Sequence, residues 1–127
     1  MNKEKLTELY KEYKLEKDDV YKHQHYLIIT RSGIDKIQAV AKIQVNYEVV
    51  RCETNFAVFK AIAHKGAATI ETFGSALKGE GYKDGSTNSW YVAEMAEKRA
   101  MSRAVLKLTG FYELGVFGED ESESFKK

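Results

Sequence analysis

The chain has 127 residues, of which 43% are hydrophobic and 31% charged, so it can form one compact domain with its own core. Its longest apolar runs fall far short of the roughly 18 residues that a membrane span needs. The charged start MNKEKLTELYKEYK is unlike a secretory signal. The single cysteine, Cys52, excludes an internal disulfide framework and a thiolate metal cluster. We therefore expect a cytoplasmic protein in which Cys52 is a buried structural thiol.

The net charge of +1 is unevenly distributed along the chain. The last segment, GEDESESFKK at residues 118–127, holds four acidic residues and two lysines, and without it the chain keeps 18 basic and 15 acidic residues, a net charge of +3. We therefore expect a single domain over residues 1–117 and a disordered acidic tail over residues 118–127. The role of this tail is left open, because it can increase solubility, compete for the basic surface of its own domain or recruit a partner protein.

The N-terminal part of the chain alternates helical and extended patterns. Residues 2–14 place apolar side chains at helical spacing, and the polar residues 16–25 read as a connection. Residues 26–30, YLIIT, predict a short buried strand. The next segment, SGID at residues 32–35, has the form of a capping box and predicts a short helix that ends near Lys42.

Three consecutive segments in the middle of the chain are predicted strands. Residues 43–50, 55–64 and 67–76 alternate side chains between two faces, and short turn signals separate them. They would form an antiparallel β-meander. The expected fold class is therefore α+β: a three- to four-stranded antiparallel meander, packed on one face by a long C-terminal helix, with short N-terminal helices.

A glycine-rich loop at residues 77–89 precedes this long helix, which is predicted over residues 90–108. Asn88 or Ser89 would cap its start, and Gly110 would end it. One side of the helix carries a row of small residues that would let it sit close to the sheet. This row consists of Ala93, Ala96, Ala100 and Ala104.

The other side of the helix carries basic residues. Arg99, Arg103 and Lys107 follow each other at intervals of four residues, with Lys98 beside them. Guanidinium groups in a row can bind successive phosphates through paired hydrogen bonds. The same residues can also form an ordinary solvated face, with cations placed near the negative end of the helix dipole. The pattern leaves both interpretations open.

Part of the chain resembles the phage-type single-strand annealing proteins of the Erf and Red-beta kind. The resemblance covers roughly residues 43–112 and is carried by Gly74-Ser75-Ala76, the glycine-rich loop, and the segment AEMAEKRAMSRAVLKLTG at residues 93–110. It implies single-stranded DNA binding along a basic groove, assembly into a homo-oligomer, and annealing without ATP in phage or mobile-element recombination or replication. This chain is shorter than most members, and its body is only mildly basic. The EDESESF segment of the tail is similar to the partner-recruiting ends of single-strand binding proteins, apart from the final Lys126-Lys127.

The candidate residues for single-stranded DNA binding combine cations, which attract phosphates, with rings on which bases stack. They are Arg51, Lys60, Lys65, Tyr82, Trp90, Tyr91, Lys98, Arg99, Arg103 and Lys107. Lys60 interrupts an apolar strand face, so it can alternatively be a lysine that protects a sheet edge.

Catalytic and metal-binding patterns are weak in this sequence. The glycines at residues 79–85 lack the Lys-Ser/Thr ending of a phosphate-binding loop. His23 and His25 have no third ligand at a motif spacing, so no metal and no cofactor is expected. We therefore expect a non-enzymatic protein. The alternatives are a protein-interaction or oligomerisation module with no nucleic-acid role, and a small metal-dependent nuclease built on Glu71 and Asp84.

Overall fold

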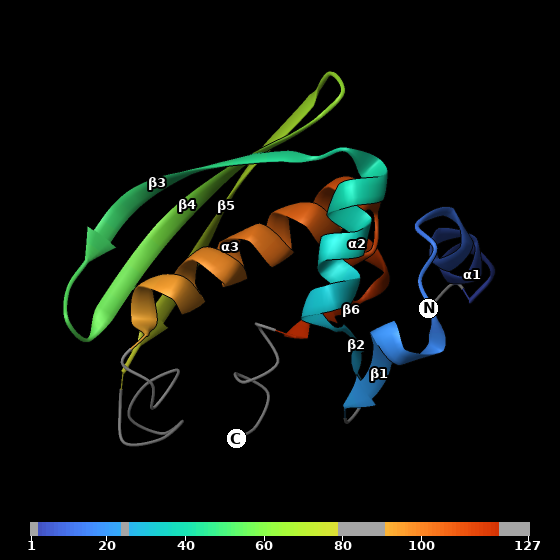
Figure 1. Ribbon diagram of the computed structural model, residues 1–127, viewed down its shortest axis with the longest axis horizontal. Helices are drawn as coiled ribbons and strands as arrows, with labels where there is room; N and C mark the ends of the chain where they lie inside the picture. Colours follow the sequence, from blue (N-terminus) through green and yellow to red (C-terminus); the bar gives the residue numbers. More distant parts are fainter. Residues whose placement is uncertain (1–2, 24–25, 79–90, 120–127) are drawn as a thin grey trace.

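The computed structural model describes residues 3–23, 26–78 and 91–119 of the protein. Helices and strands are interspersed along the chain, and Figure 1 shows their arrangement. In chain order they are α1 (Lys3–Glu12), the 3-10 helix η1 (Lys17–Asp19), β1 (Val20–His23), β2 (Tyr26–Ile29), α2 (Arg31–Ala41), β3 (Gln44–Cys52), β4 (Phe56–Lys65), β5 (Ala68–Leu77), α3 (Val92–Thr109), the 3-10 helix η2 (Tyr112–Leu114) and β6 (Val116–Gly118).

The described strands form two three-stranded sheets, one in the order β1-β2-β6 and one in the order β3-β4-β5. The long helix α3 joins the two parts of the molecule. It packs against β4 and β5 and also contacts β6 and α2, as can be followed in Figure 1. The predicted α+β class, with an antiparallel meander packed against a long C-terminal helix, is confirmed.

The β3-β4-β5 meander has one covered face and one open face. In β4, Ala57, Phe59, Ala61 and Ala63 are buried, while the residues between them are partly exposed. The buried set faces α3, because β4 and β5 are the strands that this helix contacts most. The alternating sequence pattern therefore correctly predicted the strands, and the helix determines which set of side chains becomes the core.

Small residues allow α3 to lie close to β5. Ala96 and Ala100 are fully buried, and a Cβ atom on Gly74 would lie 2.2 Å from the carbonyl oxygen of Ala96. The Thr72 hydroxyl donates a hydrogen bond of 2.6 Å to the carbonyl oxygen of Ala100. The alanine row and the Gly74-Ser75-Ala76 segment therefore belong to one helix–sheet contact.

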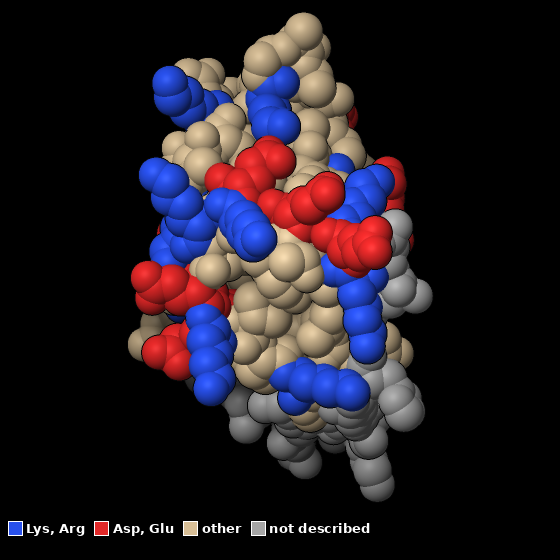
Figure 2. All heavy atoms as spheres, turned by 90° about the vertical axis from the view of Figure 1, so that its right-hand side faces the viewer, with Lys and Arg blue, Asp and Glu red and all other residues tan. Residues whose placement is uncertain are grey.

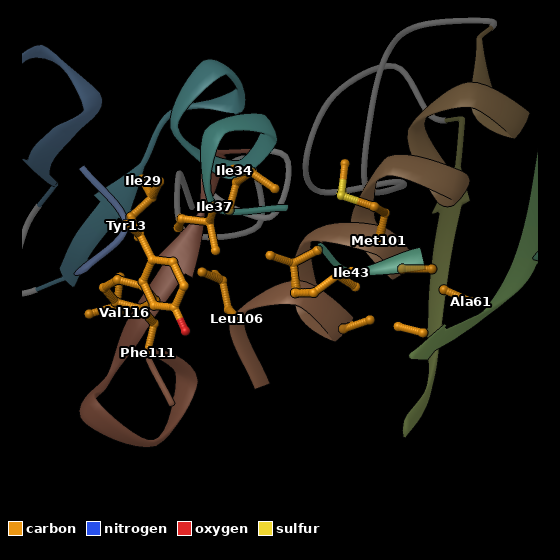
Figure 3. Close-up of a cluster of buried hydrophobic side chains, with 14 of the residues drawn as sticks. Tyr13, Ile29, Ile34, Ile37, Ile43, Ala61, Met101, Leu106, Phe111 and Val116 are labelled. Atoms are coloured by element: carbon orange, nitrogen blue, oxygen red, sulfur yellow. The ribbon is translucent and has the colours of Figure 1, made fainter. Parts of the chain in front are cut away.

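The larger hydrophobic core surrounds the C-terminal half of α3. Side chains from the N-terminal elements, α3 and the last strand meet there, and Figure 3 shows part of the cluster. Among its buried members are Tyr13, Ile29, Ile34, Ile37, Leu106, Phe111 and Val116.

Two details in the N-terminal part of the chain differ from the prediction. The segment 16–25 contains η1 and β1, and β1 pairs antiparallel with β2. The cap of α2 is Thr30, whose hydroxyl accepts a hydrogen bond of 3.1 Å from Gly33 N, so the predicted capping box at residues 32–35 is wrong. Thr30 precedes the helix in extended backbone, which is the geometry that an N-cap requires.

The predicted tail begins inside the fold. Gly118 ends β6, and the backbone amide of Arg31 donates a hydrogen bond of 2.9 Å to Glu119 Oε1. Residues 120–127 lie outside the described part of the chain. Across the ranges that are described, no helix has both the length and the apolar character of a membrane span.

Candidate nucleic-acid interface

The outer edge of β5 presents backbone groups to the side chains of α3. In an antiparallel strand the N–H and C=O of one residue point to the same side, and this side alternates along the strand. Lys78 N donates a hydrogen bond of 2.7 Å to Asn55 O. In the register of β4 and β5, the even-numbered residues of β5 therefore direct their N–H and C=O groups toward β4. Phe73 and Ser75 therefore direct their carbonyl groups away from β4.

Two arginines of α3 bind these outward carbonyls. Arg99 Nη1 donates to Ser75 O at 2.8 Å, and Arg103 Nη1 donates to Phe73 O at 2.9 Å. The spacings match, because four residues of helix rise about 6 Å and two residues of strand extend about 7 Å. We call this surface the arginine-covered edge of β5.

The two arginines differ in exposure. Only 7% of Arg99 is exposed, so its guanidinium is a structural partner of β5 and does not project into solvent as an exposed ridge would require. Arg103 is partly exposed. The carbonyl groups of an edge strand compete with water for a nearby guanidinium. Arg99 is therefore not part of a solvated helix face.

The residue whose carbonyl group Arg103 binds carries an exposed aromatic ring. The side chain of Phe73 is 51% exposed on the open face of the sheet, and its carbonyl oxygen is the atom that Arg103 binds. The sequence pattern does not identify Phe73, because alternation alone does not tell which face of a strand a helix will cover. Once the face covered by α3 is known, a phenylalanine on the opposite face is the signal that identifies Phe73.

Lys60 lies on the open face in the centre of the sheet. Its Nζ is 2.6 Å from Glu71 Oε1 and 3.5 Å from Glu48 Oε2. The hydrogen bond with Glu71 raises the pKa of Lys60 above its ordinary value, with the charges of Glu71 and Glu48 adding to the effect. Because β4 is the central strand, Lys60 does not protect a sheet edge. Its charge is balanced within its own chain.

The other predicted cations are dispersed. Arg51 pairs with Glu53 and lies over the Phe56 ring, at 5.5 Å from its centroid. Lys65 lies at the opposite end of the meander, in the last position of β4.

The remaining predicted residues lie on or before α3. Tyr91, 69% exposed, immediately precedes the helix. Lys98 is partly exposed, and Lys107 is exposed with its Nζ 5.2 Å from the centroid of the Tyr112 ring. Tyr82 and Trp90 lie outside the described residues, as do the predicted caps Asn88 and Ser89. The structure thus brings Arg99 and Arg103 together on one edge, while Arg51, Lys60 and Lys65 lie along the sheet.

Candidate groups for other chemistry are also separated or used elsewhere. Cys52 is exposed, so the prediction of a buried thiol is wrong. Glu71 binds Lys60, while His25 and Asp84 lie outside the described residues. In the ranges that the structure describes, no three His, Cys, Asp or Glu side chains are grouped as metal ligands would be.

Charges of both signs are mixed at the end of the molecule formed by α1 and α2. Figure 2 shows this end, where Lys and Arg side chains alternate with Asp and Glu side chains. A mixed surface gives little attraction for a polyanion. The arginine-covered edge of β5, where Arg103 binds the backbone of the exposed Phe73, is therefore the better candidate interface. The chain matches no protein-family model, no curated protein and no solved structure.

Proposed function

We propose that this protein binds single-stranded DNA along the arginine-covered edge of β5. One observation carries the proposal: the Arg103 guanidinium is held on the carbonyl oxygen of Phe73, and the ring of the same Phe73 is half exposed. A cation held at the backbone of a residue whose ring is exposed supplies the two groups that single-strand binding surfaces combine, a cation for phosphates and a ring for bases.

The physical chemistry of the two groups supports different parts of the proposal. A guanidinium keeps its charge at any physiological pH, so Arg103 attracts phosphates by releasing their counterions. Stacking of a base on an exposed ring contributes about 1–3 kcal/mol and tolerates any base. Lys60 contributes less, since Glu71 and Glu48 already balance its charge.

The order of the elements agrees with the resemblance from which DNA binding is expected. The chain runs from the β3-β4-β5 meander into the long helix α3, with Gly74-Ser75-Ala76 at their contact. This is the order that the resemblance to single-strand annealing proteins implies. Because the element order agrees, we extend the proposal to the annealing of complementary DNA strands in phage or mobile-element recombination or replication.

Fluorescence anisotropy with a labelled oligo-dT tests the proposal. Phe73→Ala removes the stacking platform and should weaken binding roughly 5- to 150-fold, which corresponds to about 1–3 kcal/mol. Arg103→Ala removes one phosphate contact and should flatten the slope of log K against log salt by about 0.7. Lys65→Ala, at the far end of β4, is the control and should change the affinity little. Circular dichroism verifies that each variant is folded.

Two results would count against the proposal. One is wild-type affinity in both Phe73→Ala and Arg103→Ala, which would place any DNA elsewhere. The other is the absence of salt-sensitive oligo-dT binding in the wild-type chain, which would favour a protein-interaction module. Cleavage of DNA that depends on a divalent metal would instead favour the nuclease alternative.

A further inference from the structure

The other edge of the meander, β3, presents backbone groups to solvent. Among the described strands, β3 pairs with β4 alone. Glu53 N donates to Phe56 O at 2.7 Å, so the even-numbered residues of β4 direct their backbone groups toward β3. Their partners in the register are Gln44, Asn46 and Glu48. The residues between these partners therefore direct their N–H and C=O groups outward.

The residues whose backbone groups point outward are Val45, Tyr47 and Val49, and they also carry large, mainly apolar side chains. Their side chains lie on the α3 side of the sheet, since their partners in the register are the buried Ala63, Ala61 and Phe59. The helix covers β4 and β5 more than β3, and it leaves Tyr47 39% and Val49 61% exposed. An edge strand that presents both backbone groups and large apolar side chains is a template for pairing with another strand.

We propose that β3 pairs antiparallel with β3 of a second copy of this chain, around a two-fold axis at Tyr47. Residues whose N–H and C=O groups point outward must pair with each other. Tyr47 therefore faces Tyr47 of the other copy, and Val45 faces Val49 of the other copy. On the open face, Asn46 then lies opposite Glu48 of the other copy, where an amide can donate to a carboxylate.

Charge and strand length disfavour the two adjacent registers. A shift of the axis to Glu48 would place two carboxylates directly opposite each other, which is unfavourable. A shift to Asn46 would place Val49 opposite Ile43, which precedes β3. The β-bulge between Val49 and Arg51 limits the regular pairing to the first part of β3. The axis at Tyr47 is therefore the register that pairs the whole segment from Val45 to Val49.

The two edges of the meander differ, and the difference limits the size of the assembly. Arg99 and Arg103 already bind carbonyls on the edge of β5. Growth through β3 alone joins two copies by a two-fold axis and then stops, because a closed isologous contact uses the same surface on both subunits. The product is one six-stranded sheet in the order β5-β4-β3-β3-β4-β5. The arginine-covered edges lie at its two ends, so this inference does not rest on DNA binding.

Light scattering coupled to gel filtration tests the dimer on the full chain. The wild type should elute with a mass of 29 kDa, twice the 14.5 kDa of one chain. Val49→Lys adds a charge to the paired edge and should raise the dissociation constant of the dimer by about tenfold or more. Phe73→Lys changes another exposed apolar residue, on β5, and should leave the mass at 29 kDa. A monomeric wild type at all concentrations, or a dimer unaffected by Val49→Lys, would overturn the proposal.

Disulfide trapping tests the register. In a Cys52→Ser background, Tyr47→Cys places a thiol on the axis, where opposed Cα atoms are about 5.5 Å apart, within the range of a disulfide. Glu48→Cys places the two thiols diagonally, beyond the about 7 Å that a disulfide can span. Oxidation should link Tyr47→Cys and leave Glu48→Cys unlinked, and the reverse result would refute the Tyr47 axis. Oligo-dT binding by Val49→Lys reports separately on the proposed function.

Discussion

Gly74 and Ala96 approach each other through their backbones. A Cβ atom on Gly74 would lie 2.2 Å from the carbonyl oxygen of Ala96, a separation that real Cβ atoms do not reach. The same atom would lie 2.4 Å from the backbone nitrogen of Ala100. The strand and the helix are therefore in direct contact, and neither backbone can move aside without losing hydrogen bonds of its own element.

We expect Gly74→Ala to destabilise the protein strongly. Insertion of a methyl group into a packed contact costs about 1–3 kcal/mol, and here the clash is with backbone atoms, so the upper end of that range applies. Urea unfolding measures the change. Ser75→Ala, at the neighbouring exposed position, should change the free energy of unfolding by less than about 0.5 kcal/mol. Equal unfolding midpoints for Gly74→Ala and the wild type would contradict the described contact.

Arg99 and Arg103 should contribute unequally to stability. Arg99→Met removes a charged hydrogen-bond donor from a buried site and should lower the free energy of unfolding by about 1.5–3 kcal/mol. Arg103→Met acts at a more exposed site and should cost about 1 kcal/mol or less. Thermal unfolding of the two variants makes the comparison. A larger loss for Arg103→Met would show that the exposed arginine, and not the buried one, fixes the edge of β5.

Asp19 makes the stability of the N-terminal region dependent on pH. Its Oδ2 accepts hydrogen bonds from Glu16 N at 2.9 Å and from Lys36 Nζ at 2.6 Å. The backbone N–H of Glu16, and after it Lys36, lower the pKa of Asp19 below its ordinary value. A carboxyl group with a lowered folded-state pKa stabilises the protein above its unfolded pKa of about 3.9, and this contribution disappears as the pH falls through the folded value.

Asp19→Asn should therefore be less stable than the wild type at pH 7, and the difference should shrink below about pH 4. Denaturant unfolding at a series of pH values measures this difference. Asp18→Asn, at the exposed neighbouring position, is the control. A stability difference for Asp19→Asn that stays constant from pH 7 to about pH 2 would exclude the carboxylate as its cause.

The sequence predicted the meander well because its information is local. Ala57, Phe59 and Ala61 alternate with partly exposed residues, and the alternation is visible within a few positions. The alanine row of α3 is local in the same sense, since helical spacing alone places Ala96 and Ala100 on one side. These patterns identified the elements and the small-residue contact, although not the partner of each surface.

The features that escaped prediction depend on distant parts of the chain. Arg99 is buried because the carbonyl group of Ser75, 24 residues earlier, needs a donor. Residues 20–23 become β1 only because β2 pairs with them. Phe73 is exposed because α3 covers the opposite face of β5. Local periodicity carries no information on such partners, so the pattern left open whether the cations of α3 form a solvated face or bind phosphates.

The parallel pairing of β2 with β6 has a consequence for biosynthesis. Leu27 pairs with Val116, so the first sheet acquires its third strand from the far end of the sequence. While the nascent chain leaves the ribosome, β1 and β2 emerge early and must wait for residues 116–118 before their sheet is complete. Contacts of such high sequence separation form slowly. The first sheet therefore cannot be completed until residues 116–118 have been synthesised, so its native pairing waits for the strand that is furthest from it in the sequence.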